Sequence, residues 1–240
     1  MQPLQPEMIA IDLDGTLVDS VPDLHAAIVQ MQRALVDFNP DWKNYSDAGS
    51  EAQSISTAAD VRNWVGDGIE RLVHRSLTNS LQGDAPAELF AAGLFEFRKA
   101  YQLTNGQHSS VYPNVDMTLM RLQEKKIPLC CVTNKSRAFS LSLLETHNLA
   151  DNFSLVIAGD DIEHKKPHPE SLLAAASHFG VKPSACLMVG DSIADLQAAM
   201  AAGFLFIGVS YGYNHGVSMH DVEQNPHSVI DNFVDLLNFI

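Results

Sequence analysis

The stretch Met8-Ile-Ala-Ile-Asp-Leu-Asp14 begins with four apolar residues and ends in two acids separated by one leucine. Four further apolar runs of strand length follow it, at 127–132, 154–158, 185–189 and 204–209. Continuous apolar character is typical of strands covered on both faces. Helical patterns lie between these runs, at 114–126, 136–147, 168–179 and 192–202. This alternation predicts an α/β fold with a Rossmann-like parallel sheet and helices on both faces.

Residues 18–112 interrupt this rhythm, because they contain no convincing strand. Helical patterns occur there at 21–38, 58–65, 67–79 and 86–104, and the polar stretch 39–56 is expected to be a mobile connection between helices. We therefore expect an α/β core at 1–17 and 113–240, with an all-helical domain at 18–112 inserted after the first strand. Asp19, Ser20 and Asp23 are expected to cap the first inserted helix or to lie in its first turn.

Composition excludes several classes of function. The 240 residues include 15 Lys+Arg and 29 Asp+Glu, a formal net charge of −14, which disfavours sequence-independent nucleic-acid binding. No apolar run reaches the ~20 residues of a membrane helix, and the first residues lack the features of a signal peptide. Three cysteines without CxxC spacing favour reduced thiols in the cytoplasm.

Ten histidines without HxH or HExxH pairing are expected to be surface or core residues. Nothing marks an interface, so a monomer or weak homo-oligomer is expected.

Polar residues follow several of the predicted strands. In open α/β sheets, ligands bind at the carboxyl ends of the strands. The first run ends in Asp12–Asp19, the second in Thr133-Asn-Lys-Ser136 and the fourth in Gly190-Asp-Ser-Ile-Ala-Asp195, while Lys165-Lys-Pro-His-Pro169 follows the third. We expect these four segments to meet at one edge of the sheet.

These residue types suit chemistry on a phosphate ester. Asp12 and Asp191 offer the hard oxygen ligands that Mg²⁺ prefers. Gly15 permits a tight turn that brings backbone N–H groups near a ligand. Thr133 offers a hydroxyl donor, and Lys166 a compact positive charge for phosphoryl oxygens. In displacement at phosphorus, positioning and charge stabilisation carry most of the catalysis.

The same segments resemble a known superfamily. Asp-Leu-Asp-Gly-Thr-Leu-Val-Asp-Ser at 12–20, Val132–Lys135, Lys165–Pro169 and Val189–Asp195 are similar to the four signatures of the haloacid dehalogenase-like hydrolases, in the same order. In that family a helical cap of the type-one kind occupies the place of the inserted helical domain. The resemblance implies a hydrolase with this core and cap.

Carried over residue by residue, the resemblance implies a role for each site residue. Asp12 is the nucleophile that forms an aspartyl-phosphate, and Asp14 protonates the leaving oxygen and then activates water. Mg²⁺ is bound by the Asp12 carboxylate, the Asp14 backbone carbonyl and Asp191. Thr133 and Lys166 hold the phosphoryl oxygens. A further acid, Asp195, is expected to fix the lysine or a metal-bound water.

Two more segments resemble the phosphoglycolate phosphatases of proteobacteria. They are Asn63-Trp-Val-Gly-Asp-Gly68 in the helical insertion and Ser210-Tyr-Gly-Tyr-Asn-His-Gly216 after the fifth run. The implied reaction is hydrolysis of 2-phosphoglycolate, a small phosphate monoester, to glycolate and phosphate. The residues expected to contact this substrate are Gly15, Asn134, Gly66 and Gly68.

Other functions remain open from the sequence alone. The main alternative is a sugar-phosphate phosphatase or a β-phosphoglucomutase-like phosphotransferase of the same superfamily. A more distant alternative is a phosphate-sensing protein without catalysis, in which one or more signature positions would be eroded.

Overall fold

The computed structural model describes residues 4–38, 55–223 and 226–240, so most of the predicted connection at 39–56 lies outside the described residues. The chain forms two compact units, one of Met1–Asp19 with Ser110–Ile240 and one of Ser20–Ser109. The sequence placed the helical part at 18–112. The ends differ because β2 (Val18–Asp19) and β3 (Ser110–Val111) pair as a short antiparallel ribbon within the first unit. The expectation of no strand in 18–112 was therefore wrong, because two-residue strands leave no readable periodicity.

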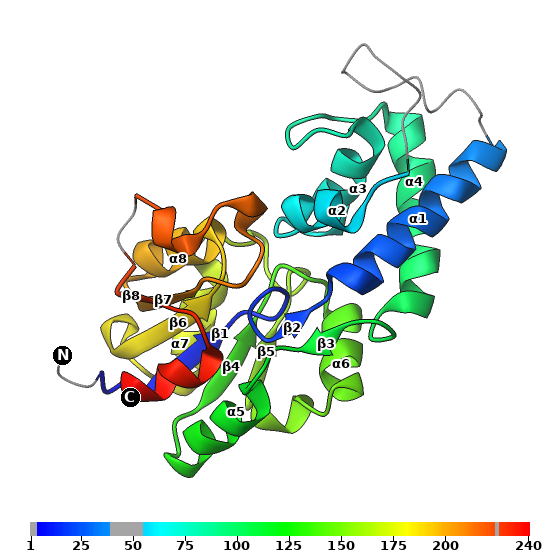
Figure 1. Cartoon of the computed structure of the whole chain (residues 1–240). Coiled ribbons are helices and arrows are strands. Elements are labelled where there is room, and N and C mark those ends of the chain that lie inside the picture. The colour runs from blue at the N-terminus through cyan, green and yellow to red at the C-terminus, as the bar shows by residue number, and fades with distance from the viewer. Residues whose placement is uncertain (1–3, 39–54, 224–225) are drawn as a thin grey trace. The chain divides into compact units, whose positions relative to one another are not determined.

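A six-stranded parallel sheet organises the first unit, in the order β5-β4-β1-β6-β7-β8 (Figure 1). β1 lies between β4 and β6, with Ile9 opposite both Leu129 and Leu187. The sequence predicted every strand of this sheet except β8, which does not lie within a longer apolar run. The strands are β1 (Met8–Ile11), β4 (Leu129–Val132), β5 (Leu155–Ile157), β6 (Cys186–Gly190), β7 (Leu205–Val209) and β8 (Ser228–Ile230).

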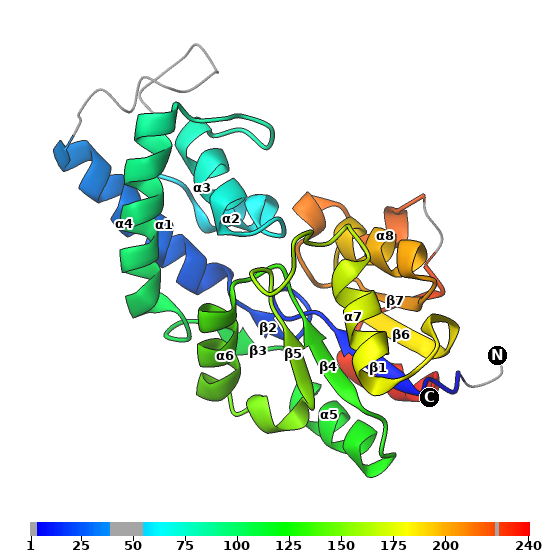
Figure 2. The same ribbon diagram turned by 180° about the vertical axis from the view of Figure 1, so that it is seen from behind.

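Both faces of this sheet are covered by helices (Figures 1 and 2). In β1, Ile9 and Ile11 join one buried cluster with α5 and α6, whereas Met8 and Ala10 join another with α7 and α8. Each fully buried aliphatic side chain of this size contributes roughly 1.5–3 kcal/mol, which explains the continuous apolar runs. The predicted fold class is confirmed. The helices are α5 (Val115–Glu124), α6 (Arg137–Thr146), α7 (Glu170–Phe179) and α8 (Ile193–Ala202), with short 3₁₀ turns at Ala150–Asn152, Pro183–Ala185, Asn214–Gly216, Met219–Asp221 and Phe233–Asn238.

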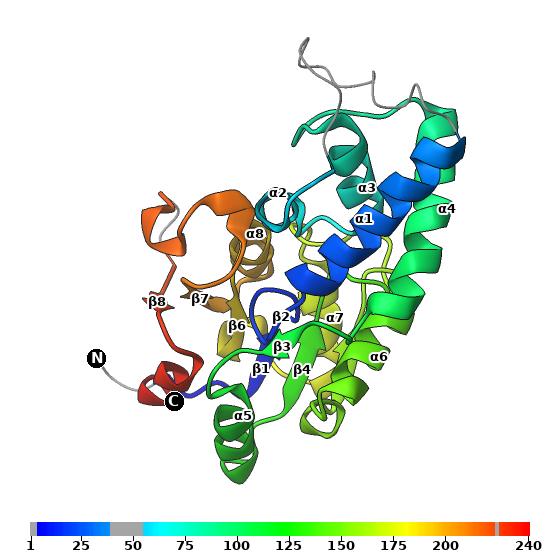
Figure 3. The same cartoon turned by 45° about the vertical axis from the view of Figure 1, so that its right-hand side comes forward.

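The second unit is helical in the residues that the structure describes. Its helices are α1 (Val21–Phe38), α2 (Ala58–Trp64), α3 (Ile69–Thr78) and α4 (Ala87–Thr104). Figure 3 shows α1 and α4 side by side. Within the described ranges, no helix combines the length and apolar character needed to span a bilayer.

Asp23 joins the two ends of the helical unit. It lies in the first turn of α1, as expected, but it is fully buried. Its carboxylate accepts hydrogen bonds from the backbone N–H groups of Gly106 at 2.7 Å and His108 at 2.6 Å. The side chain therefore fixes the segment after α4 to the start of α1, a role that the sequence did not indicate.

Candidate active site

Four polar side chains gather where strands of the parallel sheet end. Asp12 follows β1, Thr133 follows β4 and Asp191 follows β6, and Lys166 lies in the connection from β5 to α7. All four are buried. Because β4, β1 and β6 are adjacent and parallel, their carboxyl ends lie at the same edge of the sheet. The topology thus brings residues from distant parts of the sequence to one place.

The ammonium group of Lys166 lies at the centre of this edge. Its Nζ lies 2.6 Å from Asp12 Oδ1 and 2.6 Å from Asp195 Oδ1, and it donates to the Val132 carbonyl at 2.8 Å. Asn134 holds the backbone of the lysine from both sides: Lys166 N donates to Asn134 Oδ1 and Asn134 Nδ2 donates to Lys166 O, each at 2.9 Å. The side chain of Asn134, expected to contact substrate, is therefore engaged in positioning the lysine.

Asp195 is fixed at both carboxylate oxygens. While Oδ1 contacts Lys166, Oδ2 accepts hydrogen bonds from Ser192 Oγ at 2.7 Å and Ser192 N at 3.1 Å, as part of the capping box that begins α8. A Cβ at Gly190 would overlap this carboxylate, so the strand end approaches it closely. This arrangement leads us to infer that Asp195 orients the lysine.

Asp191 lies in a cradle made mainly of backbone. Its Oδ2 accepts a hydrogen bond from the Tyr213 N–H at 2.7 Å, and its Oδ1 one from Thr16 Oγ1 at 3.3 Å. Gly15, at φ +92°, and Gly212 come so near that a Cβ at either position would clash with the carboxylate. The glycine of the first motif therefore allows the β1 loop to contact the acid after β6, and its contact with substrate stays a prediction.

The acid cluster, defined here as Asp12, Asp191 and Asp195, carries more negative charge than Lys166 alone neutralises. One ligand oxygen from each acid lies within 4.8 Å of the others. Burial raises the pKa of Asp12 well above its usual value, against the opposing effect of Lys166. Burial, with the charge of Asp195 acting in the same direction, raises the pKa of Asp191 to about 7.

The lysine itself stays charged. Burial lowers the pKa of Lys166, but the charges of Asp12 and Asp195 outweigh it and hold that pKa above its ordinary value. Three buried carboxylates therefore face one cation. Crowded carboxylates either take up protons or bind a metal ion, and hard oxygen donors of this kind fit Mg²⁺. The donor set of the acid cluster is thus suited to a divalent cation.

Asp14 is paired with a lysine to which the sequence gave no role. Lys135 Nζ lies 3.1 Å from Asp14 Oδ1 and 3.3 Å from Oδ2, and both side chains are largely buried. The backbone N–H of Lys135 donates to Thr133 Oγ1 at 3.2 Å, which fixes the hydroxyl. A lysine three residues after the end of a core strand was the available signal, since that position lies at the ligand-binding edge.

Gly66 and Gly68 belong to the helical unit. Both have positive φ, +134° for Gly66 and +89° for Gly68, and Gly68 is the N-cap residue of α3. Between them, Asp67 accepts a hydrogen bond from Arg75, a buried side chain that also donates to the Trp64 carbonyl. The two glycines therefore shape the turn between α2 and α3, and their contact with substrate stays a prediction.

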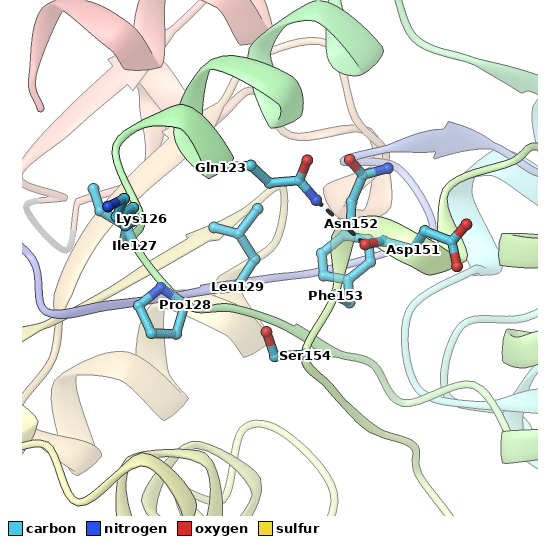
Figure 4. A pocket seen from close by; sticks show the side chains of 9 residues that line it. All are labelled: Gln123, Lys126, Ile127, Pro128, Leu129, Asp151, Asn152, Phe153 and Ser154. Carbon is cyan, nitrogen blue, oxygen red and sulfur yellow. Dashed lines mark hydrogen bonds between the residues drawn. The ribbon is translucent and has the colours of Figure 1, made fainter.

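A groove lies at the opposite edge of the sheet, at the amino ends of β4 and β5 (Figure 4). Its volume is about 430 Å³, and Gln123 Nε2 donates to the Asp151 carbonyl across part of it at 3.2 Å. It is lined by Gln123, Lys126, Ile127, Pro128, Leu129, Asp151, Asn152, Phe153 and Ser154. No catalytic set of side chains converges in it among the described residues, so it is not a candidate active site.

The raised pKa of Asp191 leads to a prediction for stability. The pKa of the Asp191 carboxyl is about 7 in the folded protein and ~3.9 in the unfolded chain. At a pH between these two values, the folded state therefore binds more protons than the unfolded state. Its contribution to stability is therefore present at low pH and decreases as the pH rises to about 7. Asp191→Asn removes this dependence. We expect the free energy of unfolding of the variant, relative to wild type, to increase from pH 4 to above pH 7 without divalent cations.

Urea unfolding with EDTA over this pH range measures the effect, and saturating Mg²⁺ should abolish it because the cation stabilises the ionised wild-type carboxylate. Asp116→Asn, at an exposed acid in the first turn of α5, is the control. A difference between the Asp191→Asn variant and wild type that does not change with pH would contradict the prediction.

Comparison with known proteins agrees with these features. The family model of the haloacid dehalogenase-like hydrolases matches residues 6–203. The chain is 41% identical to a phosphoglycolate phosphatase of Nitrosococcus oceani, over 98% of this chain and 97% of that protein. It is 37% identical to a phosphoglycolate phosphatase of Nitrosospira multiformis, over 92% of this chain and 90% of that protein. A crystal structure described as a predicted phosphoglycolate phosphatase from Haemophilus somnus superimposes with a TM-score of 0.84 at 30% identity. The match covers 98% of this chain and 97% of that chain.

Proposed function

The chain belongs to the haloacid dehalogenase-like hydrolase family, and on that premise we propose that it is a phosphatase that hydrolyses 2-phosphoglycolate to glycolate and phosphate. The observation that carries the proposal is the contact of 2.6 Å between Lys166 Nζ and Oδ1 of Asp12, a member of the acid cluster. It pairs a carboxylate nucleophile with a cation suited to phosphoryl oxygens. The substrate is inferred from the names of the relatives and from the Asn63–Gly68 and Ser210–Gly216 segments.

In the first step, a carboxylate oxygen of Asp12 attacks the phosphorus atom. A bond from this oxygen to phosphorus forms while the bond from phosphorus to the glycolate oxygen breaks, and Asp14 gives its proton to the leaving oxygen. Lys166 orients the nucleophile and balances charge on the phosphoryl oxygens, and the fixed hydroxyl of Thr133 donates to one of them. The products of this step are glycolate and an aspartyl-phosphate.

In the second step, water attacks the phosphorus of the aspartyl-phosphate. Asp14, now a carboxylate, accepts a proton from the water, and the bond between phosphorus and the Asp12 oxygen breaks. Inorganic phosphate leaves and the Asp12 carboxylate is restored. Lys135 contacts both oxygens of Asp14, so it is positioned to hold this side chain in place between the two proton transfers.

Mg²⁺ fits the residues that would hold it: the Asp12 carboxylate, the Asp14 backbone carbonyl and Asp191. When bound, it would reduce the repulsion between the anionic nucleophile and the anionic phosphate ester. Asp195 is assigned a different role, because its Oδ1 contacts Lys166 and its Oδ2 belongs to the capping box of α8. Its proposed role is to orient Lys166.

Selection of the substrate is assigned to local groups. Long-range attraction does not favour an anion here, since the net charge is −14 and exposed charges are largely screened beyond ~8 Å. We propose that the helical unit serves as the cap of the family, and that backbone N–H groups near Gly15, Gly66 and Gly68 contribute to binding. The cytoplasm is the proposed location, because the three cysteines are buried and reduced.

The test is release of inorganic phosphate from a panel of small esters, with Mg²⁺ and with EDTA. The panel contains 2-phosphoglycolate, β-glucose 1-phosphate, glucose 6-phosphate and glycerol phosphate. We expect the kcat/KM for 2-phosphoglycolate to exceed the others at least about tenfold, since a pocket built for one ester discriminates by roughly 1–3 kcal/mol. EDTA should remove the activity.

Two results would contradict the proposal. Turnover of sugar phosphates without turnover of 2-phosphoglycolate would overturn the substrate, and conversion of β-glucose 1-phosphate to glucose 6-phosphate would identify a phosphotransferase. No phosphate release from any ester with Mg²⁺ present would overturn the phosphatase itself.

A further inference from the structure

A second group of potential metal ligands lies outside the acid cluster, in the connection from β5 to α7. It consists of His164, His168 and Glu170. The Nδ1 atoms of His164 and His168 lie 3.0 Å and 3.8 Å from Glu170 Oε2. The two imidazole rings are adjacent, with centroids 4.6 Å apart. The sequence assigned these histidines no role because they form no HxH or HExxH pair, but the loop brings them together.

Two of the three separations between ligand atoms are close to those around a tetrahedral zinc ion. Zinc binds imidazole nitrogen and carboxylate oxygen at about 2.0–2.1 Å, so neighbouring ligand atoms are about 3.3–3.4 Å apart. The distances of 3.0 Å and 3.8 Å lie on either side of this value. The spacing from His164 to His168, with three residues between them, also occurs among zinc ligands. Two histidines and one carboxylate leave a fourth position for water.

The carboxylate is already held in place by backbone. Glu170 Oε1 accepts a hydrogen bond from Glu163 N, and Oε2 accepts one from His164 N, both at 3.0 Å. These contacts, with that to the His164 ring, lower the pKa of Glu170. Fixed partners of this kind orient metal ligands. Both histidine side chains are about half exposed, at 55% and 52%, so an ion from solvent has access to them.

We propose that His164, His168 and Glu170 form a binding site for Zn²⁺ that is separate from the acid cluster. Imidazole ligands favour zinc over magnesium, which prefers oxygen ligands and retains water. Lys166 lies midway between the two histidines in sequence, so a bound ion joins both flanks of the loop that carries this lysine. Zinc binding at this site does not depend on the phosphatase activity.

The test is a zinc titration of the full chain against a chromophoric zinc indicator, with millimolar Mg²⁺ present to occupy the acid cluster. We expect one high-affinity equivalent. His164→Gln and His168→Gln should each weaken zinc binding at least about tenfold, because each removes one of three ligands. The matched control is His178→Gln, at an exposed histidine in the last turn of α7, which should bind zinc as the wild type does.

A second measurement uses the unaltered chain, so that it does not depend on the folding of a variant. In ¹⁵N-histidine-labelled wild type, zinc should shift the ring signals of two of the ten histidines, in the presence of Mg²⁺. Unchanged zinc affinity in both His164→Gln and His168→Gln would overturn the proposal. Loss of the bound zinc when Mg²⁺ is raised, or a titration without shifted histidine signals, would overturn it as well.

Discussion

Asp12→Asn is expected to abolish phosphate release, lowering kcat at least about 10⁴-fold, since removal of a covalent nucleophile in a hydrolase costs ~10⁶. An amide does not attack phosphorus as a carboxylate does. The fold should remain, because Lys166 keeps its contacts with Asp195 and the Val132 carbonyl. The substitution also removes a buried carboxyl group, and burial raises the pKa of that group. Steady-state kinetics with Mg²⁺, together with thermal unfolding, measures both results.

The matched control for this variant is Asp116→Asn, an exposed acid in the same unit, which should retain full activity. Retained turnover by purified Asp12→Asn would show that another group attacks the phosphate. Loss of activity together with loss of the folded state would point to a structural role for Asp12 and would contradict the expected stability.

Lys166→Met is the second substitution with a large expected effect. It leaves Asp12 and Asp195 buried without their common cation, and breaking a buried ion pair from one side costs about 3–5 kcal/mol. Activity should decrease about 10²–10³-fold, as for loss of one preorganised charge-stabilising donor. Urea unfolding at neutral pH without metal and phosphate release with Mg²⁺ check the two parts separately.

The neighbouring lysine supplies the control. Lys165→Met changes the same residue type one position earlier, at a side chain that is only partly buried. We expect much smaller losses of stability and activity than for Lys166→Met. If Lys165→Met were inactive and Lys166→Met active, the phosphate-binding role would belong to Lys165.

The sequence predicted most of the fold because each core strand is buried on both faces. The continuous apolar runs ending in Val132 and Val189, for example, predict strands that are covered on both faces. It failed for β2, β3 and β8, which are two or three residues long and do not lie within a run of four or more apolar residues. Such segments gain their conformation from the strands beside them, and a pattern in the sequence does not carry that information.

The candidate site was predictable in part for a topological reason. Parallel strands place their carboxyl ends together, so Asp12, Thr133 and Asp191 were expected at one edge without knowledge of any side-chain contact. The partners of these groups were not predictable in this way. That Lys135 contacts Asp14, and that Asn134 holds the Lys166 backbone, depends on how loops from different strands meet.

The histidine pair in the connection from β5 to α7 shows the same limit. The rings of His164 and His168 are neighbours across the loop, and the Glu170 carboxylate is held beside them by the backbone N–H groups of Glu163 and His164. A search for ligand pairs on one helix face does not detect ligands that a loop brings together. Local motifs therefore indicate which residues carry chemistry, whereas the pairing among them requires the folded chain.

The most direct test of the mechanism follows the phosphoryl group itself. Wild-type enzyme turning over 2-phosphoglycolate with labelled phosphorus and Mg²⁺ is quenched rapidly in acid, digested and mapped by mass spectrometry. The mechanism predicts label on the peptide that contains Asp12, and none on that peptide in Asp12→Asn. Label on a different residue, or steady turnover with no labelled peptide under the same quench, would contradict it.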